Sequence, residues 1–289
     1  MATSLRNENQ KPEQGLDPFG PLSTPGQLLI ERAAIQSIPE LRDALRDRLL
    51  GPDRHRRLEL DDLLSTGDLI LGDAYEMSLY GLKPEAFVDQ NLALVGRTAI
   101  ECKVDAHCEP VADQLAAICR DRHFANRKIT VLDPFLGSGN LLYHTACRLN
   151  AEEAIGAEKD LAVSIATAHN FTALNFDASV INGPMAETDV MDIPEEHLVV
   201  LLIDPPWGTG HSLFTEGLDL SRTEPPVKEV MASFKRWLSA ENKLIFVAAA
   251  YERTKESSID ELTSTYRLVA ECRSTRLSSG SNVNYLIFE

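Results

Sequence analysis

Segments of two hydrophobic periods alternate along the last two thirds of the chain. Short unbroken apolar runs are typical of strands buried on both faces, and apolar residues three and four positions apart are typical of one face of a helix. The apolar runs lie at 129–132, 154–157, 179–181, 199–203 and 244–247. The helical segments lie at 109–119, 141–149, 161–174 and 227–238. Strands that alternate with helices predict an α/β fold with a mostly parallel sheet covered on both faces.

The two ends of the chain depart from this alternation. Residues 266–272 and 283–288 have the pattern of two strands joined by a turn rich in serine and glycine, so the last strand is predicted to run antiparallel. Residues 1–25 combine polar residues with proline and glycine, which predicts a flexible arm. Residues 26–105 begin with leucines at helical spacing and predict a mainly helical N-terminal accessory region. The alternating domain then spans 106–289.

A glycine-rich loop, Asp133-Pro134-Phe135-Leu136-Gly137-Ser138-Gly139, follows the first of these buried strands and precedes a helix. Such a turn brings backbone N–H groups close to a ligand. The loop is not a dinucleotide fingerprint, because Leu142 stands where the third glycine would be, and no Lys-Ser/Thr pair follows Gly139 as in a triphosphate-binding loop. Asp133 can accept a hydrogen bond from the ammonium of an amino-acid-like ligand, or it can cap the amides of its own loop.

Acidic residues also follow the next two strands. Glu158 ends the second strand about twenty residues beyond Gly139, where an acidic side chain can bind the hydroxyl pair of a ribose. Asp189 or Asp192 is the corresponding acidic candidate after the third strand. The glycine loop and these acids, in this order, indicate a nucleoside ligand.

The tetrapeptide Asp204-Pro205-Pro206-Trp207 stands where the fully apolar run 198–203 stops. Consecutive prolines fix φ and remove two backbone donors, so the strand ends there. A carboxylate, backbone acceptors and an aromatic ring are then left at the tip of the strand, where open α/β sheets bind their ligands. The alternative is a strand-ending turn in which Asp204 caps a helix and Trp207 packs on the surface.

The chain is acidic, with 28 Lys and Arg against 44 Asp and Glu and a formal net charge of −16. This charge opposes long-range attraction to the phosphates of a nucleic acid. No stretch approaches the roughly twenty apolar residues of a membrane span, and the N-terminus does not have the pattern of a signal peptide, so we expect a cytoplasmic protein with no membrane partner. The spacing of the histidines and cysteines predicts no metal site.

The glycine loop, Gly156-Ala157-Glu158 and the tetrapeptide resemble, in this order, the motifs of class I S-adenosylmethionine-dependent methyltransferases. More narrowly, the chain looks like the amino-methyltransferase group with an Asp-Pro-Pro-aromatic tetrapeptide. The resemblance implies a Rossmann-like methyltransferase sheet over 106–289 and S-adenosylmethionine as cofactor. The helix predicted from Glu109, which His107-Cys108 precede, is similar in position to a segment that flanks the cofactor in some members. The residues implied to bind the cofactor are Asp133, Phe135, Gly137, Gly139, Glu158 and Asp189.

The resemblance also implies how the tetrapeptide acts. A nitrogen attached to a planar ring or carbonyl is a poor nucleophile because its lone pair is delocalised, so catalysis needs acceptors that hold its N–H groups. Asp204 would accept one N–H through its carboxylate and Pro205 another through its carbonyl, while Trp207 stacks on the ring. The loop that continues to about Pro226 would close over the substrate as a lid. Further substrate contacts are expected from Pro206, Gly208 and His211.

The sequence leaves the methyl acceptor open. A guanine or adenine amino group in RNA is one class of acceptor that fits the tetrapeptide. A small planar amine or amide, or a glutamine side chain of a protein, is the other, and the acidic charge counts against RNA. Two alternatives belong to other classes, a non-catalytic S-adenosylmethionine-binding scaffold and a nicotinamide oxidoreductase. The presence of Asp204 and Gly139 disfavours the scaffold, and Leu142 disfavours the oxidoreductase.

Overall fold

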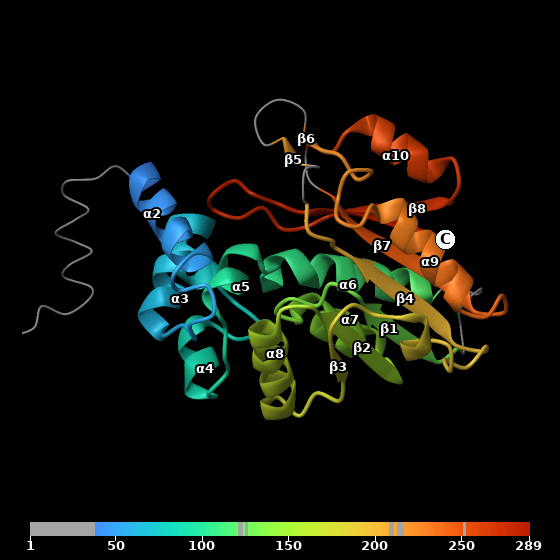
Figure 1. The fold of residues 1–289 in the computed structure, drawn as a ribbon, viewed down its shortest axis with the longest axis horizontal. Helices are drawn as coiled ribbons and strands as arrows, with labels where there is room; N and C mark the ends of the chain where they lie inside the picture. The colour runs from blue at the N-terminus through green and yellow to red at the C-terminus, as the bar shows by residue number, and fades with distance from the viewer. Residues whose placement is uncertain (1–37, 121–123, 125–126, 208–210, 213–216, 251–252) are drawn as a thin grey trace, which may run out of the picture. The chain divides into compact units, whose positions relative to one another are not determined.

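Figure 1 shows the fold in a computed structural model, which describes residues 38–120, 124, 127–207, 211–212, 217–250 and 253–289. For residues 211–212 the description covers the backbone only. Ile38–Glu289 forms one compact unit, and the fold below is that of this unit. The arm predicted at 1–25 lies outside the described residues.

A seven-stranded sheet with the order β3-β2-β1-β4-β7-β9-β8 forms the centre of this unit. Its strands are β1 (Ile129–Asp133), β2 (Glu153–Glu158), β3 (Ser179–Asn182), β4 (Leu198–Ile203), β7 (Lys243–Ala250), β8 (Leu268–Arg273) and β9 (Asn284–Phe288). Neighbouring strands pair in parallel except at β9, which runs antiparallel to both β7 and β8. The predicted Rossmann-like sheet, mostly parallel with an antiparallel last strand, is confirmed.

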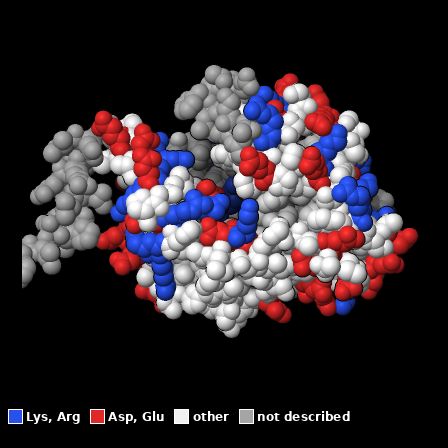
Figure 2. All heavy atoms as spheres, viewed as in Figure 1, with Lys and Arg blue, Asp and Glu red and all other residues white. Residues whose placement is uncertain are grey.

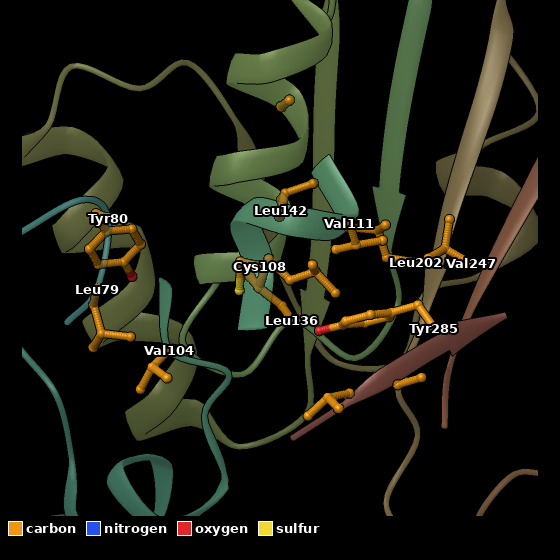
Figure 3. Packing of buried hydrophobic residues seen from close by; sticks show 14 of the residues in the cluster. Leu79, Tyr80, Val104, Cys108, Val111, Leu136, Leu142, Leu202, Val247 and Tyr285 are labelled. Atoms are coloured by element: carbon orange, nitrogen blue, oxygen red, sulfur yellow. The ribbon is translucent and has the colours of Figure 1, made fainter. Parts of the chain in front are cut away.

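Helices cover both faces of the sheet, and the sheet separates two hydrophobic clusters. They are α6 (Asp105–Cys119), α7 (Asn140–Leu149), α8 (Leu161–Ala173), α9 (Val227–Trp237) and α10 (Glu256–Thr263). In β4, Leu202 belongs to the cluster that contains α6 and α7, whereas Val199 belongs to the cluster that contains α9. Figure 3 shows Leu202 in the first of these clusters with Val111 and Leu142. A strand buried on both faces has no solvent-facing positions, which explains the unbroken apolar run.

The N-terminal region packs on the first of these two clusters. Its helices are α2 (Ile38–Leu50), α3 (Leu60–Thr66), η1 (Gly67–Leu71), η2 (Ala74–Glu76), α4 (Pro84–Asp89) and α5 (Gly96–Glu101). Leu45 and Leu49 of α2, whose spacing of four is typical of a helix, are buried in this cluster. Leu79 and Tyr80 belong to it as well (Figure 3). The mainly helical character predicted for this region is confirmed.

Helix α6 begins at Asp105, earlier than the start predicted from Glu109-Pro110. Pro110 has no N–H, so the carbonyl of Ala106, one turn earlier, has no partner within the helix. The N–H of Thr275, in the loop between β8 and β9, donates to that carbonyl at 3.0 Å. A residue distant in sequence therefore lets a proline stand inside the helix, which a local pattern does not reveal.

A buried polar network joins the N-terminal region to the glycine loop. The side-chain oxygen of Asn140 accepts the N–H of Tyr80 at 2.7 Å. Its Nδ2 donates to the carbonyl of Lys103 at 2.8 Å and to Oδ1 of Asp105 at 3.1 Å. The hydroxyl of Tyr80 donates to the carbonyl of Ser138. Because Asn140 is only 1% exposed, water does not replace a bond that is lost here, and an unpaired group would be costly.

The same network holds Tyr80 in an unfavourable backbone conformation. Its φ of 58° lies in the left-handed region, which costs a residue with a side chain about 1–2 kcal/mol. Nδ2 of Asn170 donates to the Tyr80 hydroxyl at 3.3 Å. The Asn170 amide also exchanges two hydrogen bonds with the backbone of Ala93, at 2.7 and 2.8 Å. These tertiary contacts fix the turn and offset its local cost.

A second set of contacts ties the N-terminal region to the loop between β8 and β9. The carboxylate of Glu76 accepts the N–H and the hydroxyl of Ser278, each at 2.9 Å. The N–H of Ser279 donates to the carbonyl of Leu71 at 2.6 Å. The N-terminal region is thus fastened to the glycine loop and to the C-terminal strand pair, so the segment between α5 and α6 has a fixed place beside the sheet.

Replacing Asn140 with alanine tests the network. The change leaves the buried N–H of Tyr80 without its partner and removes the Asn140 donor from the carbonyl of Lys103 and from Asp105. We therefore expect the free energy of unfolding to fall by about 2–4 kcal/mol. Asn182→Ala, which removes one bond from an exposed amide to the carbonyl of Glu158, should cost less than about 1 kcal/mol. Urea unfolding measures both losses. Equal losses would contradict a special role for Asn140.

Candidate functional site

Two neighbouring strand ends form the candidate site. Strands β1 and β4 pair in parallel, so the residues at their carboxyl ends, Asp133 and Asp204, emerge at the same edge of the sheet. Both line a pocket of about 50 Å³. The pocket lining includes Glu101 and Lys103 ahead of α6, the loop residues Asp133, Phe135 and Gly137, and Asp204. The glycine loop and the acid of the tetrapeptide, which lie far apart in sequence, therefore share one pocket.

Two positions of the loop require glycine. Gly137 and Gly139 have φ values of 50° and 73°, in the left-handed region that favours glycine. Gly139 also lies against α8, where an added Cβ would come within 2.4 Å of Cζ of Phe171 and 2.8 Å of Cγ2 of Thr167. The hydroxyl of Thr167 donates to the carbonyl of Gly137 at 2.7 Å. The loop is therefore held close to α8 in one conformation.

N–H groups of the loop are bonded within the protein. The N–H of Phe135 donates to Oδ1 of Asp133 at 3.0 Å, and that of Gly137 donates to Oε2 of Glu158 at 3.0 Å. A phosphate-binding loop instead turns its N–H groups towards the ligand. The geometry adds a physical reason to the sequence argument against a pyrophosphate, and it fits a nucleoside ligand without phosphates.

Asp133 is buried behind the loop, with 4% of its surface exposed. Burial, together with the negative charges of Asp204 and Glu158, raises the pKa of Asp133 to about 7, against the opposing effects of the Phe135 N–H and the Lys103 charge. A positively charged ligand beside this group would favour its ionised form. The site is therefore prepared for a cationic group near Asp133.

Glu158 stands at the end of β2, as the sequence predicts, and is half-buried. Besides its bond to Gly137, it accepts the N–H of Asp160 through Oε1 at 2.7 Å. A carboxylate offers about four acceptor positions, so each oxygen keeps capacity for a hydroxyl group of a ligand. Glu158 thus supports the glycine loop and retains the chemistry expected for a ribose contact.

Asp204 is paired with a lysine that the sequence did not indicate. Nζ of Lys103 lies 2.5 Å from Oδ2 of Asp204, and the two side chains are 11% and 22% exposed. The resemblance implies that the helix from Glu109, preceded by His107-Cys108, flanks the cofactor, whereas residues 101–103, just before α6, line the pocket. Nothing in the local hydrophobic pattern distinguishes this lysine, so only the tertiary fold brings it to the site.

His107 and Cys108 lie inside α6 and are buried. No other described residue donates to or accepts from the ring nitrogens of His107, and burial, with the positive charge of Lys103, lowers the pKa of His107 to about 3. Burial raises the pKa of the Cys108 thiol. A neutral imidazole and a protonated thiol suit the core, and neither residue lines the pocket.

The tetrapeptide leaves the edge of the sheet along the second cluster. Pro205 is buried and Pro206 is exposed, and the carbonyl of Pro206 accepts the N–H of Glu224 at 2.8 Å. Trp207 is half-buried and packs against the cluster that contains α9. Gly208 lies outside the described residues, as does the side chain of His211. The expected substrate contacts of these residues stay predictions.

The segment expected to act as a lid is fixed at its C-terminal end. The short strands β5 (His211–Ser212) and β6 (Gly217–Leu218) pair antiparallel. Leu218 is buried, and its backbone bonds the carbonyl of Arg253 at 2.6 Å and the N–H of Lys255 at 2.8 Å. From Gly217 onwards the segment is therefore part of the packed fold. Residues 208–210 and 213–216 lie outside the described residues.

The candidates for an adenine contact lie beyond β3. Asp189 accepts the N–H of Ala186 at 2.7 Å and so caps the N-terminal end of the short helix η3 (Glu187–Asp189). Asp192 is exposed. Neither residue lines the pocket of Asp133 and Asp204, so a role in binding stays a prediction.

Several arginines of the N-terminal region are paired with acids. Arg48 and Arg56 each lie 2.9 Å from Asp62, and His55 lies 2.9 Å from Asp160. Figure 2 shows Lys and Arg side chains over the N-terminal helices with Asp and Glu among them. This mixed surface offers less attraction to phosphates than the number of arginines suggests.

The part of the chain that the structure describes contains neither a candidate metal site nor a candidate membrane span. No group of His, Cys, Asp and Glu side chains there is arranged to hold a metal ion. No helix within the described ranges is both long enough and apolar enough to cross a bilayer.

Comparison with known proteins finds similar folds only. No family profile and no curated protein matches the sequence. The B. subtilis M1A22 tRNA methyltransferase TrmK is 15% identical over 62% of this chain and 64% of that chain, with a TM-score of 0.39. The human methyltransferase 10 domain-containing protein is 14% identical over 62% and 82%, with a TM-score of 0.43. M. capricolum TrmK, solved with S-adenosylhomocysteine, is 8% identical over 62% and 67%, with a TM-score of 0.41.

Asp133→Asn tests the burial of this carboxyl group. Because the pKa rises from 3.8 to about 7 on folding, the stability that the protonated group contributes is complete below pH 3.8 and is lost as the pH rises to about 7. The free energy of unfolding of Asp133→Asn, relative to the unmodified protein, should therefore rise across this window by at most about 1.4 kcal/mol per pH unit. Urea unfolding at several pH values measures this slope.

Asp177→Asn is the matched control, because Asp177 is exposed. The difference in free energy of unfolding between this variant and the unmodified protein should not change over the same pH window. If the corresponding difference for Asp133→Asn also does not change with pH, the raised pKa of Asp133 is contradicted.

Proposed function

We propose that this protein is an S-adenosylmethionine-dependent N-methyltransferase whose acceptor is a planar amino or amide nitrogen. One observation carries the proposal, namely that the glycine loop after β1 and Asp204, the acid of the tetrapeptide after β4, line the same pocket. A methyl group can pass between cofactor and acceptor only if both are held within one site. The order of the motifs, which resembles that of class I methyltransferases, supports the same proposal.

The pocket suits the amino-acid end of S-adenosylmethionine in its charge and its hydrogen bonding. The carboxylates of Glu101, Asp133 and Asp204 line it together with Lys103, an acidic balance that favours a ligand with sulfonium and ammonium groups. When bound, the cofactor supplies a methyl group activated by the sulfonium. Asp133 would accept from the ammonium, and Glu158 would accept from the ribose hydroxyls. The loop residues Phe135, Gly137 and Gly139 would contact the cofactor.

The tetrapeptide would hold the acceptor nitrogen. Asp204 would accept one N–H and the carbonyl of Pro205 another, which turns the lone pair out of conjugation and towards the methyl group. Consecutive prolines restrict the backbone at this point, so the acceptors are fixed before the substrate binds. Trp207 would stack on the planar group. The nitrogen becomes acidic once methylated, so its proton can leave without a strong base.

The acceptor belongs to one of two classes, a small planar amine or amide, or a nucleobase amino group in RNA. TrmK is a tRNA methyltransferase, and that substrate is stated for TrmK alone. The formal charge of −16 and the pairing of arginines with acids favour a small acceptor here. For both classes, Asp204 and the carbonyl of Pro205 would accept the N–H groups of the planar nitrogen.

Transfer of label from methyl-labelled S-adenosylmethionine tests the activity and separates these classes. Total RNA, DNA, protein and a small-molecule extract are incubated separately with the unmodified protein and with Asp204→Ala. Loss of the side-chain acceptor should lower the rate about 100- to 1000-fold, because alanine cannot accept the N–H of the reacting nitrogen in the transition state. Cofactor binding, measured by calorimetry, should persist in the variant. Asp177→Ala, which removes an exposed acid away from the pocket, should leave the rate unchanged.

The outcomes divide the alternatives. Label in the small-molecule fraction that depends on Asp204 supports the proposal as stated, and label in RNA identifies the nucleobase class. Cofactor binding without transfer to any fraction would identify a scaffold and refute the catalytic role. A rate within twofold of the unmodified protein for Asp204→Ala would refute the role of that residue.

A further inference from the structure

Lys103 occupies the point where the two halves of the candidate site meet. Its Nζ lies 2.5 Å from Oδ2 of Asp204, within the distance of a charge-assisted hydrogen bond. Both side chains are mostly buried, at 11% and 22% exposure, so this pair is screened less by solvent than a surface pair. The acceptor that the proposed chemistry needs is thus already engaged by a cation.

The backbone of Lys103 is anchored, whereas its side chain extends into the pocket. Nδ2 of Asn140 donates to the Lys103 carbonyl at 2.8 Å, and the thiol of Cys108 lies 3.6 Å from the same oxygen. Val104, the next residue, is fully buried. A lysine has a flexible four-carbon stem that can redirect its ammonium without moving such an anchor. Lys103 can therefore change partners within the pocket while its backbone stays in place.

The charges of the pocket suit Lys103 to bind the carboxylate of the cofactor. Among the described residues that line the pocket, Lys103 alone is cationic, and it faces Glu101, Asp133 and Asp204. The amino-acid end of S-adenosylmethionine carries an ammonium and a carboxylate. The acids suit the ammonium, whereas the ligand carboxylate needs a cation to offset its desolvation.

We propose that Lys103 exchanges Asp204 for the carboxylate of the cofactor, so that cofactor binding releases Asp204 to accept an N–H of the substrate. This inference rests on the proposed function. Lys103 then acts as a positioning residue that couples the two binding events, and the cofactor binds before the acceptor. Before the cofactor binds, the ion pair keeps Asp204 from holding a nitrogen in a site that cannot yet transfer a methyl group.

A pair of ligands isolates the carboxylate contact. S-adenosylhomocysteine carries the carboxylate, and its decarboxylated form keeps the amine and the nucleoside. Calorimetric titration should show that Lys103→Met weakens S-adenosylhomocysteine about 10- to 100-fold, the loss of one charge-assisted bond. Binding of the decarboxylated ligand should stay within about twofold or improve. Lys103→Arg, which keeps the charge, should recover most of the affinity.

A lysine at the opposite end of the sheet supplies the control. Lys243 is exposed and begins β7, so it lies at the amino ends of the parallel strands, away from the pocket. Lys243→Met should leave the affinity for both ligands unchanged.

Asp204→Asn tests the exchange itself. If Lys103 is shared between Asp204 and the ligand carboxylate, removing the charge at Asp204 should raise the affinity for S-adenosylhomocysteine several-fold, on the order of 3- to 10-fold. The gain should be absent for the decarboxylated ligand and absent in the double variant with Lys103→Met. A purely structural role for the ion pair would change both ligands alike.

The outcomes separate this inference from the proposed function. If neither ligand binds the unmodified protein, the proposed cofactor is wrong and the inference falls with it. If both bind but Lys103→Met weakens both equally or neither, the cofactor assignment stands and the exchange is refuted. A gain for Asp204→Asn that persists without Lys103 also refutes the exchange. Selective loss with Lys103→Met and a Lys103-dependent gain with Asp204→Asn support it.

Discussion

The buried side-chain amide of Asn140 holds the candidate site together. As the first residue of α7, it follows the glycine loop directly, and it bonds Tyr80, the carbonyl of Lys103 and Asp105 at once. An amide is suited to this position because it accepts on one side and donates twice on the other. Three chain segments therefore meet at one residue, and the place of Lys103 beside Asp204 follows from it.

The site combines a rigid loop with charges that remain to be compensated. Asp133 and Glu158 accept N–H groups of the glycine loop, which fixes the loop before any ligand arrives. Their negative charge, with that of Asp204, exceeds the charge of Lys103 within the same region. Such a site favours a ligand that brings positive charge without phosphates. Structure and electrostatics thus select the same chemical class of ligand.

Much of this architecture could be predicted from local sequence. The central strands, such as β4, are unbroken apolar runs because both faces of the sheet are covered there. The loop with Gly137 and Gly139 and the acid Asp204 stand directly at strand ends. Lys103 could not be predicted, since its pairing depends on how the N-terminal region packs. Helix α6 begins at Asp105 and not at the predicted Glu109. Pro110 leaves the carbonyl of Ala106 without a donor inside the helix, and the N–H of Thr275, distant in sequence, bonds it instead. Local patterns thus located the strand ends, but not the residues that long-range packing brings to them.

A crystal structure of the protein with S-adenosylhomocysteine tests the central claim most directly. The account predicts that the amino-acid end occupies the pocket between Asp133 and Asp204 and that the ribose hydroxyls bond to Glu158, with the thioether sulfur facing the tetrapeptide. A nucleoside bound elsewhere on the sheet, or one whose sulfur faces away from Asp204, would contradict it.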